Sequence, residues 1–589
     1  MEFQRRRNKA AELPLGGRAE KYNKKRNTKL YVLLGMALVT IVLVFVVLTS
    51  QGEPKTDVTT HRNQPAEHED RPDAETADTP TDPQEEPEPE PEKQQQQQQP
   101  QGEWKQPERK TPQKKPSTTK PTASEEENAR RQAAVAAAFN FTLSNYIARA
   151  MGADELRPVS GNPFNDLNYA CTLVDAMSTA LVMGMDEHYR VLRDYVVSER
   201  FDPFNRGRVS VFETTIRVLG GLESAYALTG ATDAALLAKT LDVFESLRPA
   251  FATATGIPIP WVVISNRRTS GWGGASNLAE CGTLQLELSY LTEATGNPEY
   301  RELGQRIMRT LVAHNGRSDG LFPADVNIHS GGLSGGVHAG SGSDSFYEYL
   351  VKMYVMHRSG FDADDVAIAA RYEALATRAL SGLLSLETRS TQGYAFLSAE
   401  HLGCFVGGMY ALAAHTLPNL TPDVRESFFR AGARYTEGCY MAYATSPTGL
   451  AADAFDLHNP AGNLAATGRS HILRPEAIES IFYLWRYTHD QKYREWGWNM
   501  FQAIERNLRR QYGYTGLYNA QDPASQNDHQ QSWFLGETLK YYYLLFSDDD
   551  VVPLDRYVFN TEAHPLPVCS WHSHPANSTT RSPNAASNH

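Results

Sequence analysis

The feature that most restricts the possible folds is a long-period repeat of paired helical patterns. Residues 224–247, 289–311 and 482–504 each show an aromatic apolar helix pattern, a turn with Asp or Asn, and a second, amphipathic pattern. The first pattern ends near Thr229, Thr295 or Thr488, and these positions fit a unit of about 64 residues. A repeat of this length is typical of stacked helical hairpins.

Stacked hairpins form either an open solenoid or a closed ring. A unit of about 64 residues fits the range 130–568 nearly seven times, whereas open solenoids usually have shorter units and polar terminal caps. We therefore predict an all-α fold in which helical hairpins close into a ring around a central cavity.

An uncharged segment near the N-terminus predicts a membrane anchor. The range 30–50 contains no charged residue and is close to the ~20 residues that a helix needs to cross a bilayer. Ten Lys or Arg residues precede it, against three Glu, which places the preceding side in the cytosol. The alternative, a cleaved signal peptide, is disfavoured by the long apolar run and the lack of a cleavage site. We predict a cytoplasmic tail (1–29) and a type II signal anchor (30–50).

Composition divides the remainder of the chain. The range 51–128 is rich in Pro, Glu, Gln and Lys, and such segments bury too little apolar surface to fold. We predict a disordered stem there, a globular domain over 129–568 and a disordered tail over 569–589. Glycosylation sequons at Asn140, Asn419 and Asn577 agree with a luminal location.

Charge and motif content exclude several function classes. The net charge is −12 and the basic residues gather only at the N-terminus, so nucleic-acid binding has no electrostatic support. No HExxH or Cys/His set suggests zinc, and no Ser/His/Asp or Cys/His catalytic pattern is recognisable.

Five acidic residues stand out because of their aromatic or apolar surroundings. Each has an ordinary explanation: a surface ion pair of Glu213 with Arg217, helix capping by Asp344, or a helix start at Glu476 after a proline. Glu537 lies in an aromatic segment and needs a partner for its charge. Glu562 lies outside any helical pattern.

Taken together, these acids indicate a functional cavity. Glycoside hydrolysis requires a carboxylic acid that protonates the leaving oxygen and a carboxylate that activates water. An acid-lined cavity is also suited to a hard cation such as Ca²⁺. Both interpretations remain open from the residues alone.

The motifs resemble glycoside hydrolase family 47, the class I α-1,2-mannosidases. The resemblance covers about residues 135–568 and is carried by seven segments in a specific order, at 210–230, 277–296, 342–352, 400–412, 473–488, 532–549 and 557–567. It implies an (α/α)7 barrel whose narrow end is closed by a β-hairpin plug. It also implies a domain that hydrolyses terminal α-1,2-linked mannose with inversion.

The resemblance implies a calcium site in the segment 559–562. Thr561 corresponds to the direct calcium ligand of the family. Acidic residues that surround the ion mainly through water are Glu280, Glu348, Glu476, Glu479, Glu537 and Glu562.

The same resemblance assigns the chemistry. Glu213 corresponds to the acid, acting through a water, and Asp344 or Glu476 to the base, of which we favour Glu476. Sugar-binding side chains are expected among Arg217, His401, Arg474, Trp533, Phe534, Glu537 and Glu562, with one of the two aromatic residues beneath the terminal mannose.

Two further expectations concern cysteines and specificity. The resemblance pairs Cys404 with Cys439, and we expect Cys171 and Cys281 to be buried and unpaired; Cys569 has no assigned partner. Enzymes of the ER type that remove one mannose carry Arg where Gly342 stands, so we expect a roomier cavity here and trimming from Man9GlcNAc2 towards Man5GlcNAc2.

The sequence therefore predicts a calcium-dependent glycosidase of the Golgi or ER membrane that acts on high-mannose N-glycans of glycoproteins. Two alternatives differ in class: a lectin-like quality-control factor of the same fold, and an inert membrane-tethered helical scaffold. The combined presence of Glu213, Asp344, Glu476 and Thr561 favours the enzyme, because a binding protein needs neither an acid nor a base.

Overall fold

A computed structural model describes residues 122–202, 207–263, 268–270, 274–360, 362–464 and 469–569. All of them belong to one compact unit, Glu103–His589. The predicted cytoplasmic tail, the predicted anchor at 30–50 and nearly all of the predicted stem and C-terminal tail lie outside the described residues. Within the described part, no helix combines the length and apolar character required to cross a bilayer.

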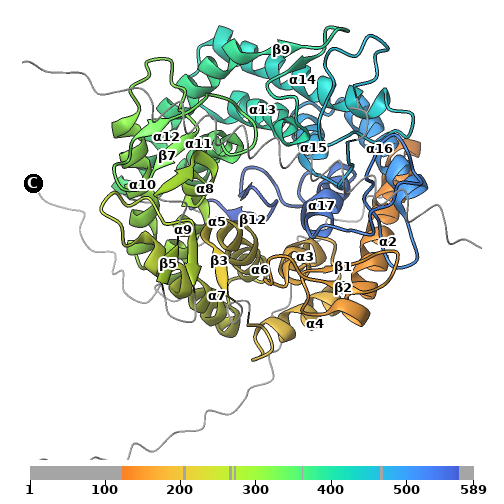
Figure 1. The fold of residues 1–589 in the computed structure, drawn as a ribbon, viewed down its shortest axis with the longest axis horizontal. Coiled ribbons are helices and arrows are strands. Elements are labelled where there is room, and N and C mark those ends of the chain that lie inside the picture. The colour runs from red at the N-terminus through yellow and green to blue at the C-terminus, as the bar shows by residue number, and fades with distance from the viewer. Residues whose placement is uncertain are drawn as a thin grey trace, which may run out of the picture. The chain divides into compact units, whose positions relative to one another are not determined.

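The helices form a ring with an inner and an outer layer (Figure 1). The inner helices are buried along nearly their whole length, and each packs against an outer helix that is adjacent along the chain or, for α17, against the N-terminal helix α2. The pairs, inner helix first, are α3 (Cys171–Val182) with α4 (Asp186–Val196), α6 (Gly220–Leu228) with α7 (Ala234–Leu247), α9 (Gln285–Thr295) with α10 (Glu299–His314), α11 (Asp344–His357) with α12 (Ala363–Leu383), α13 (Val406–Thr416) with α14 (Pro422–Ala444), α15 (Glu476–Thr488) with α16 (Gln491–Leu508), and α17 (Leu539–Leu545) with α2 (Ala123–Ala150).

The hydrophobic pattern explains the two layers. Helix α13 is buried at every position from Val406 to Ala414, as expected for a helix that is apolar on all sides. Helix α10 buries one stripe that includes Ile307, Met308 and Leu311 and leaves its polar face to solvent. The predicted helix-rich fold is confirmed, and the repeated threonines lie at the ends of inner helices α6, α9 and α15.

The prediction of an all-α fold includes only one β-hairpin, whereas the structure contains several further short strands. The described residues contain five small antiparallel sheets, mostly in the connections between helices. They comprise β1 (Glu155–Leu156) with β2 (Pro163–Phe164), β3 (Arg208–Ser210) with β4 (Trp261–Val263) and β5 (Arg268–Ser270), β6 (Ala275–Asn277) with β7 (Asp325–Asn327) and β8 (Leu333–Ser334), β9 (Thr388–Arg389) with β10 (Ala395–Phe396), and β11 (Tyr557–Phe559) with β12 (Pro565–Pro567).

The last of these hairpins lies in the middle of the ring (Figure 1). Val558 is opposite Leu566 in its register, and both side chains are buried. Strand β11 packs on α11 and β12 on α6. The turn between the strands therefore lies among the inner helices.

The ends of the domain are held by specific contacts. Helix α2 begins at Ala123, earlier than the predicted boundary at residue 129, because Thr122 and Glu125 form a capping box.

Cys404 and Cys439 form the expected disulfide. Cys171, Cys281 and Cys569 are buried free thiols. The Cys569 amide donates to the carbonyl oxygen of Met356, so this residue packs on the ring, in contrast to the predicted disordered tail that begins at residue 569.

Glycines let α13, α14 and α15 approach closely. A Cβ atom added to Gly432 of α14 would lie 2.9 Å from the carbonyl oxygen of Gly407 and 3.1 Å from the amide nitrogen of Ala411, both in α13. Because these neighbours are backbone atoms, they cannot rotate out of the way.

We expect Gly432→Ala to reduce the free energy of unfolding by at least about 1 kcal/mol through overpacking. Guanidinium denaturation followed by circular dichroism measures the change. Gly316→Ala is the matched control, since its Cβ would meet no atom within 4 Å. Equal stabilities of the two variants would contradict the close helix contact.

Candidate active site

A cavity of about 410 Å³ is lined by residues from several inner helices, the connections between helices and the turn of the hairpin. Eight carboxylic acids line it, opposed by two arginines and one tryptophan. They are Glu213, Glu280, Asp344, Glu348, Glu476, Glu479, Glu537 and Glu562, with Arg217, Arg474 and Trp533. The structure therefore brings together all the acids that the sequence analysis selected.

Helix starts position several of these acids. Asp344 is the first residue of α11, and Glu476 and Glu479 are in the first turn of α15. The free amides and the dipole at a helix N-terminus favour nearby negative charge. Asp344 does not cap its helix, because the N-cap residue is Ser343. The alternative of a simple capping role is therefore not supported.

Two π-helical segments carry further cavity residues. Thr214–Leu219 follows the short helix α5 (Val211–Glu213) and includes Arg217, whereas Phe534–Thr538 precedes α17 and includes Glu537. Such segments interrupt the regular helical spacing and often occur at functional sites.

Arg217 joins two carboxylates in the cavity wall. Its Nε donates to Glu213 at 2.8 Å and its Nη1 to Glu562 at 2.7 Å. Burial opposes the arginine's charge, but Glu562 and Glu213 hold the pKa of Arg217 well above its ordinary value. Since Arg217 is buried, the Glu213–Arg217 pair is not a solvated surface pair.

Asp344 and Glu476 have different environments. Burial raises the pKa of Asp344 to about 7, with further contributions from Glu348 and Glu476. Glu476 instead accepts from His401 Nδ1 at 2.9 Å and lies 3.4 Å from Arg474 Nη1. Asp344 can therefore hold a proton near neutral pH, whereas Glu476 has two hydrogen-bond donors, His401 and Arg474, beside its carboxyl group.

Two predicted sugar-binding residues do not line the cavity. His401 is buried between Glu476 and the Tyr443 hydroxyl, which is 2.7 Å from its Nε2. Phe534 is also buried, with its ring 5.0 Å from that of Tyr514. His401 supports Glu476, and Phe534 belongs to the core. Trp533 does line the cavity, with the guanidinium carbons of Arg217 and Arg474 5.5 and 5.6 Å from its ring centre.

Residues 138–568 match the family model described as glycosyl hydrolase family 47. The chain belongs to this family. Curated relatives include the mannosyl-oligosaccharide alpha-1,2-mannosidase IA of Drosophila melanogaster, 40% identical over 72% of this chain and 65% of the relative. A mannosyl-oligosaccharide 1,2-alpha-mannosidase of Arabidopsis thaliana is 38% identical over 74% of this chain and 79% of that protein.

A solved structure has a similar fold. The alpha-1,2-mannosidase from Trichoderma reesei superposes with a TM-score of 0.67 at 28% identity, covering 75% of this chain and 99% of that one. The matched region spans 65% of the length of two insect mannosidases, those of Drosophila melanogaster and Spodoptera frugiperda.

The family 47 cavity contains more acids than cations. Burial raises the pKa of Glu479, and burial together with Glu562 raises that of Glu537. Burial also raises the pKa of Glu562, although Arg217 opposes this shift. Burial, together with the neighbouring carboxylates, therefore favours the protonated form of some of these groups in the absence of a bound cation.

Several charged and polar residues behind the cavity wall were not predicted from the sequence. These are Asp175 of α3, Lys352 of α11, Lys540 of α17, and Asn560 and His564 of the hairpin turn, all buried. For Asp175, Lys352 and Lys540 the available signal was a charged residue within an apolar helix, the same argument that applies to Glu537; Asn560 and His564 lie in the turn, where no such pattern exists.

The hairpin turn offers oxygen atoms suited to a hard cation. Thr561 lines the cavity, and within the described residues its hydroxyl and carbonyl oxygens have no hydrogen-bond partner. Carboxyl groups of Glu280, Glu348, Glu479, Glu537 and Glu562 line the same space. A donor set made only of oxygen fits Ca²⁺ and not a soft metal.

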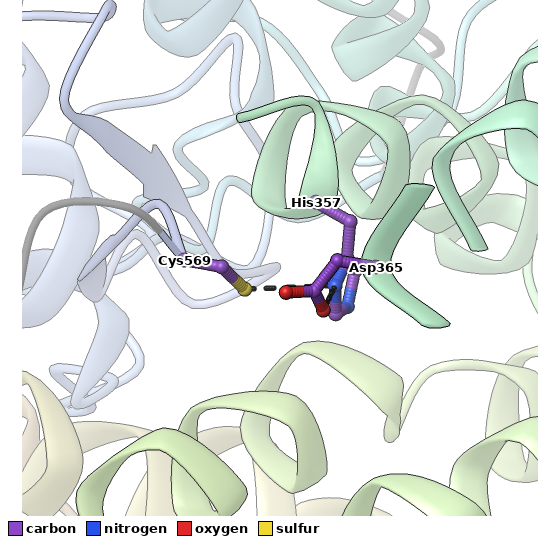
Figure 2. A group of neighbouring side chains, drawn as sticks. All are labelled: His357, Asp365 and Cys569. Atoms are coloured by element: carbon purple, nitrogen blue, oxygen red, sulfur yellow. Dashed lines mark hydrogen bonds and ion pairs between the residues drawn. The ribbon is translucent and has the colours of Figure 1, made fainter. Parts of the chain in front are cut away.

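A second group of metal-ligand types, shown in Figure 2, contains no residue that lines this cavity. Ligand atoms of His357, Asp365 and Cys569 all lie within 4.8 Å of one another. They already have partners: Asp365 accepts from Arg301 at 2.7 Å and is 2.8 Å from His357 Nδ1. Burial raises the pKa of the Cys569 thiol well above its ordinary value, and a protonated thiol is a poor ligand. This group connects the end of the hairpin to α11 and α12.

We expect Asp365→Ala to lower the free energy of unfolding by about 3–5 kcal/mol, because it removes the 2.7 Å ion pair with the largely buried Arg301 and the contact with His357 Nδ1. Arg301 then keeps only the exposed Asp362 and Asp364, at 3.6 and 3.7 Å. The neighbouring Asp364→Ala should change it by less than about 0.5 kcal/mol, since its side chain is 82% exposed and 3.7 Å from the same guanidinium. Chemical denaturation of both variants measures the difference. A small loss in Asp365→Ala would refute this structural role.

Proposed function

We propose that this chain is an inverting, calcium-dependent α-1,2-mannosidase that removes terminal mannose from high-mannose N-glycans. The observation that carries the proposal is the single cavity in which eight carboxyl groups meet the oxygens of Thr561. The names of the family 47 relatives support the same substrate class. A purely glycan-binding protein is not favoured, because the set of possible acid and base residues is complete.

The wider organisation forms part of the proposal. The helix pairs correspond to an (α/α)7 barrel over 129–568, with the β11–β12 hairpin as its plug. The uncharged range 30–50 would anchor this domain in the Golgi or ER membrane, with 1–29 in the cytosol and the range 51–128 as a stem. The range 569–589 would form the tail.

The carboxyl environments support a division of roles. Glu476 fits the general base, because His401 and Arg474 donate to it and fix its orientation. Glu213 fits an acid that acts through a water, and Asp344, with a pKa raised to about 7, fits a second proton donor. Inversion requires that a water reach the anomeric carbon from the face opposite the leaving group.

Other cavity residues would hold the sugar. Arg217 and Arg474 place their guanidinium carbons 5.5 and 5.6 Å from the ring centre of Trp533, whose apolar ring suits a sugar face. The carboxyl groups of Glu537 and Glu562 can accept hydrogen bonds from sugar hydroxyls.

Calcium would be held directly by Thr561, with Glu280, Glu348, Glu476, Glu479, Glu537 and Glu562 neutralising its charge through water. When bound, the ion would orient sugar hydroxyls and stabilise developing charge. The crowded carboxyl groups that otherwise share protons would then ionise more easily.

The position of Gly342 supports extended trimming. Gly342 lines the cavity, and an added Cβ would meet only Asn277, at 3.6 Å or more. Its φ of +87° also disfavours a side chain. The absence of a side chain here leaves room for more than one glycan branch.

The central test is incubation of the full-length protein with Man9GlcNAc2, with and without a calcium chelator, followed by mass analysis of the products. We expect trimming to Man5GlcNAc2 that the chelator abolishes and added calcium restores. A stop at Man8GlcNAc2 would refute the role of Gly342 but retain the enzyme. No release from folded protein in either condition would refute the proposed hydrolysis.

The pH dependence distinguishes the two roles considered for Asp344. An acid must be protonated, so kcat should fall as pH rises through about 7, the raised pKa of Asp344. If Asp344 were the base, kcat would rise through the same range. We expect Asp344→Asn to lower kcat strongly, by about 10²–10⁴-fold, and to remove this limb of the profile. Whether kcat falls or rises with pH in this range, measured at saturating calcium, distinguishes an acid from a base at Asp344.

A further inference from the structure

The turn that carries Thr561 is held by bonds within the turn and by bonds to the surrounding helices, among them one from Asn560 Nδ2 to Glu287 at 2.9 Å and one from the Thr561 amide to the Tyr349 hydroxyl at 3.3 Å. Asn560 Oδ1 accepts from the amides of Glu562 and His564, at 2.9 and 2.8 Å. Its Nδ2 donates to the carbonyl oxygen of Ile216. These bonds shape the turn, but the strands on either side are only three residues long, so the turn needs further support to stay in place.

Lys352 supplies one such support from α11. Its ammonium group donates to the carbonyl oxygen of Asn560 at 3.2 Å and also binds the Glu348 carboxyl group. The side chain is 1% exposed.

Lys540 supplies the other support from α17, which lies elsewhere around the ring (Figure 1). Its ammonium group donates to the carbonyl oxygen of Ala563 at 2.6 Å and to the Ser178 hydroxyl at 2.9 Å. Lys540 is fully buried. The two lysines therefore bind backbone carbonyls on both sides of Thr561.

Burying an ammonium group costs free energy unless hydrogen bonds compensate for the lost water. A lysine that only balanced the acids would direct its donors to carboxyl groups. Lys352 binds the turn's backbone as well as Glu348, and Lys540 binds the turn's backbone and the Ser178 hydroxyl. On the basis of the proposed function, we propose that Lys352 and Lys540 are positioning residues that fix the turn so that the Thr561 oxygens face a divalent cation in the cavity.

A role in charge balance alone makes the opposite prediction. If the lysines only neutralised the carboxyl groups, a neutral replacement would remove a nearby positive charge and strengthen cation binding. If they position the turn, the same replacement weakens binding, because the Thr561 oxygens are no longer held in place. The sign of the change in calcium affinity separates the two roles.

The test uses calcium titration calorimetry on the full-length protein in detergent. Lys540→Met is the main variant because it keeps the side-chain length and breaks no ion pair among the described residues. We expect it to raise the calcium Kd at least about tenfold, and Lys352→Met serves as a second variant. Circular dichroism and thermal melting establish that each variant is folded.

Ser224→Ala is the matched control. The Ser224 hydroxyl donates to the carbonyl oxygen of Pro565 at 2.8 Å, so this variant removes a buried bond to the same hairpin outside the Thr561 turn. We expect its Kd to stay within about twofold of the wild type. An unchanged or lower Kd in both folded lysine variants would overturn the proposal, as would an equal increase in Ser224→Ala.

Amide hydrogen exchange in the metal-free protein tests the two lysines independently of calcium binding. If the wild type binds no calcium, the metal part of the proposed function fails. Exchange of the amides of Glu562 and His564 in the metal-free protein then tests the lysines directly. Faster exchange in Lys540→Met than in Ser224→Ala supports the positioning role, and equal exchange overturns it.

Discussion

Eight carboxyl groups face one cavity, and the repulsion among them is the constraint on which the site depends. Charges that lie close together in a medium of low dielectric cannot all ionise without nearby cations or donors. The ring offsets this repulsion with Arg217 and Arg474 in the wall, Lys352 behind it, and helix starts at Asp344 and Glu476. These groups do not balance all of the negative charge, and the remainder would hold a divalent cation.

Closure of the ring makes this concentration of charge feasible. The first inner helix, α3, packs against the segment Phe534–Thr538 and against α17, the last inner helix, so the inner layer has no open end among the described residues. The inner helices are apolar towards their outer partners, and several begin at the cavity. The architecture thus places short polar helix starts around a central space while the long apolar surfaces form the core.

The β11–β12 hairpin shows how a small element can determine a site. Its strands pair over three residues, yet its turn contributes Thr561 and Glu562 to the cavity and receives bonds from α11 and α17. Asp344 and Glu476 illustrate the complementary point, because two acids in first turns acquire different properties from burial and from His401. Position on a helix sets the direction of a side chain, and neighbours set its chemistry.

The sequence by itself determined the helical repeat, the pairing of helices and five of the eight cavity acids, because apolar periodicity and uncompensated charges in apolar segments are local signals. The other three, Glu280, Glu348 and Glu479, were identified only through the resemblance to family 47. Tertiary structure alone decided that His401 supports Glu476, that Phe534 is in the core, and that Lys352 and Lys540 bind the hairpin turn. These outcomes depend on contacts between residues far apart in the chain, so no local pattern specifies them.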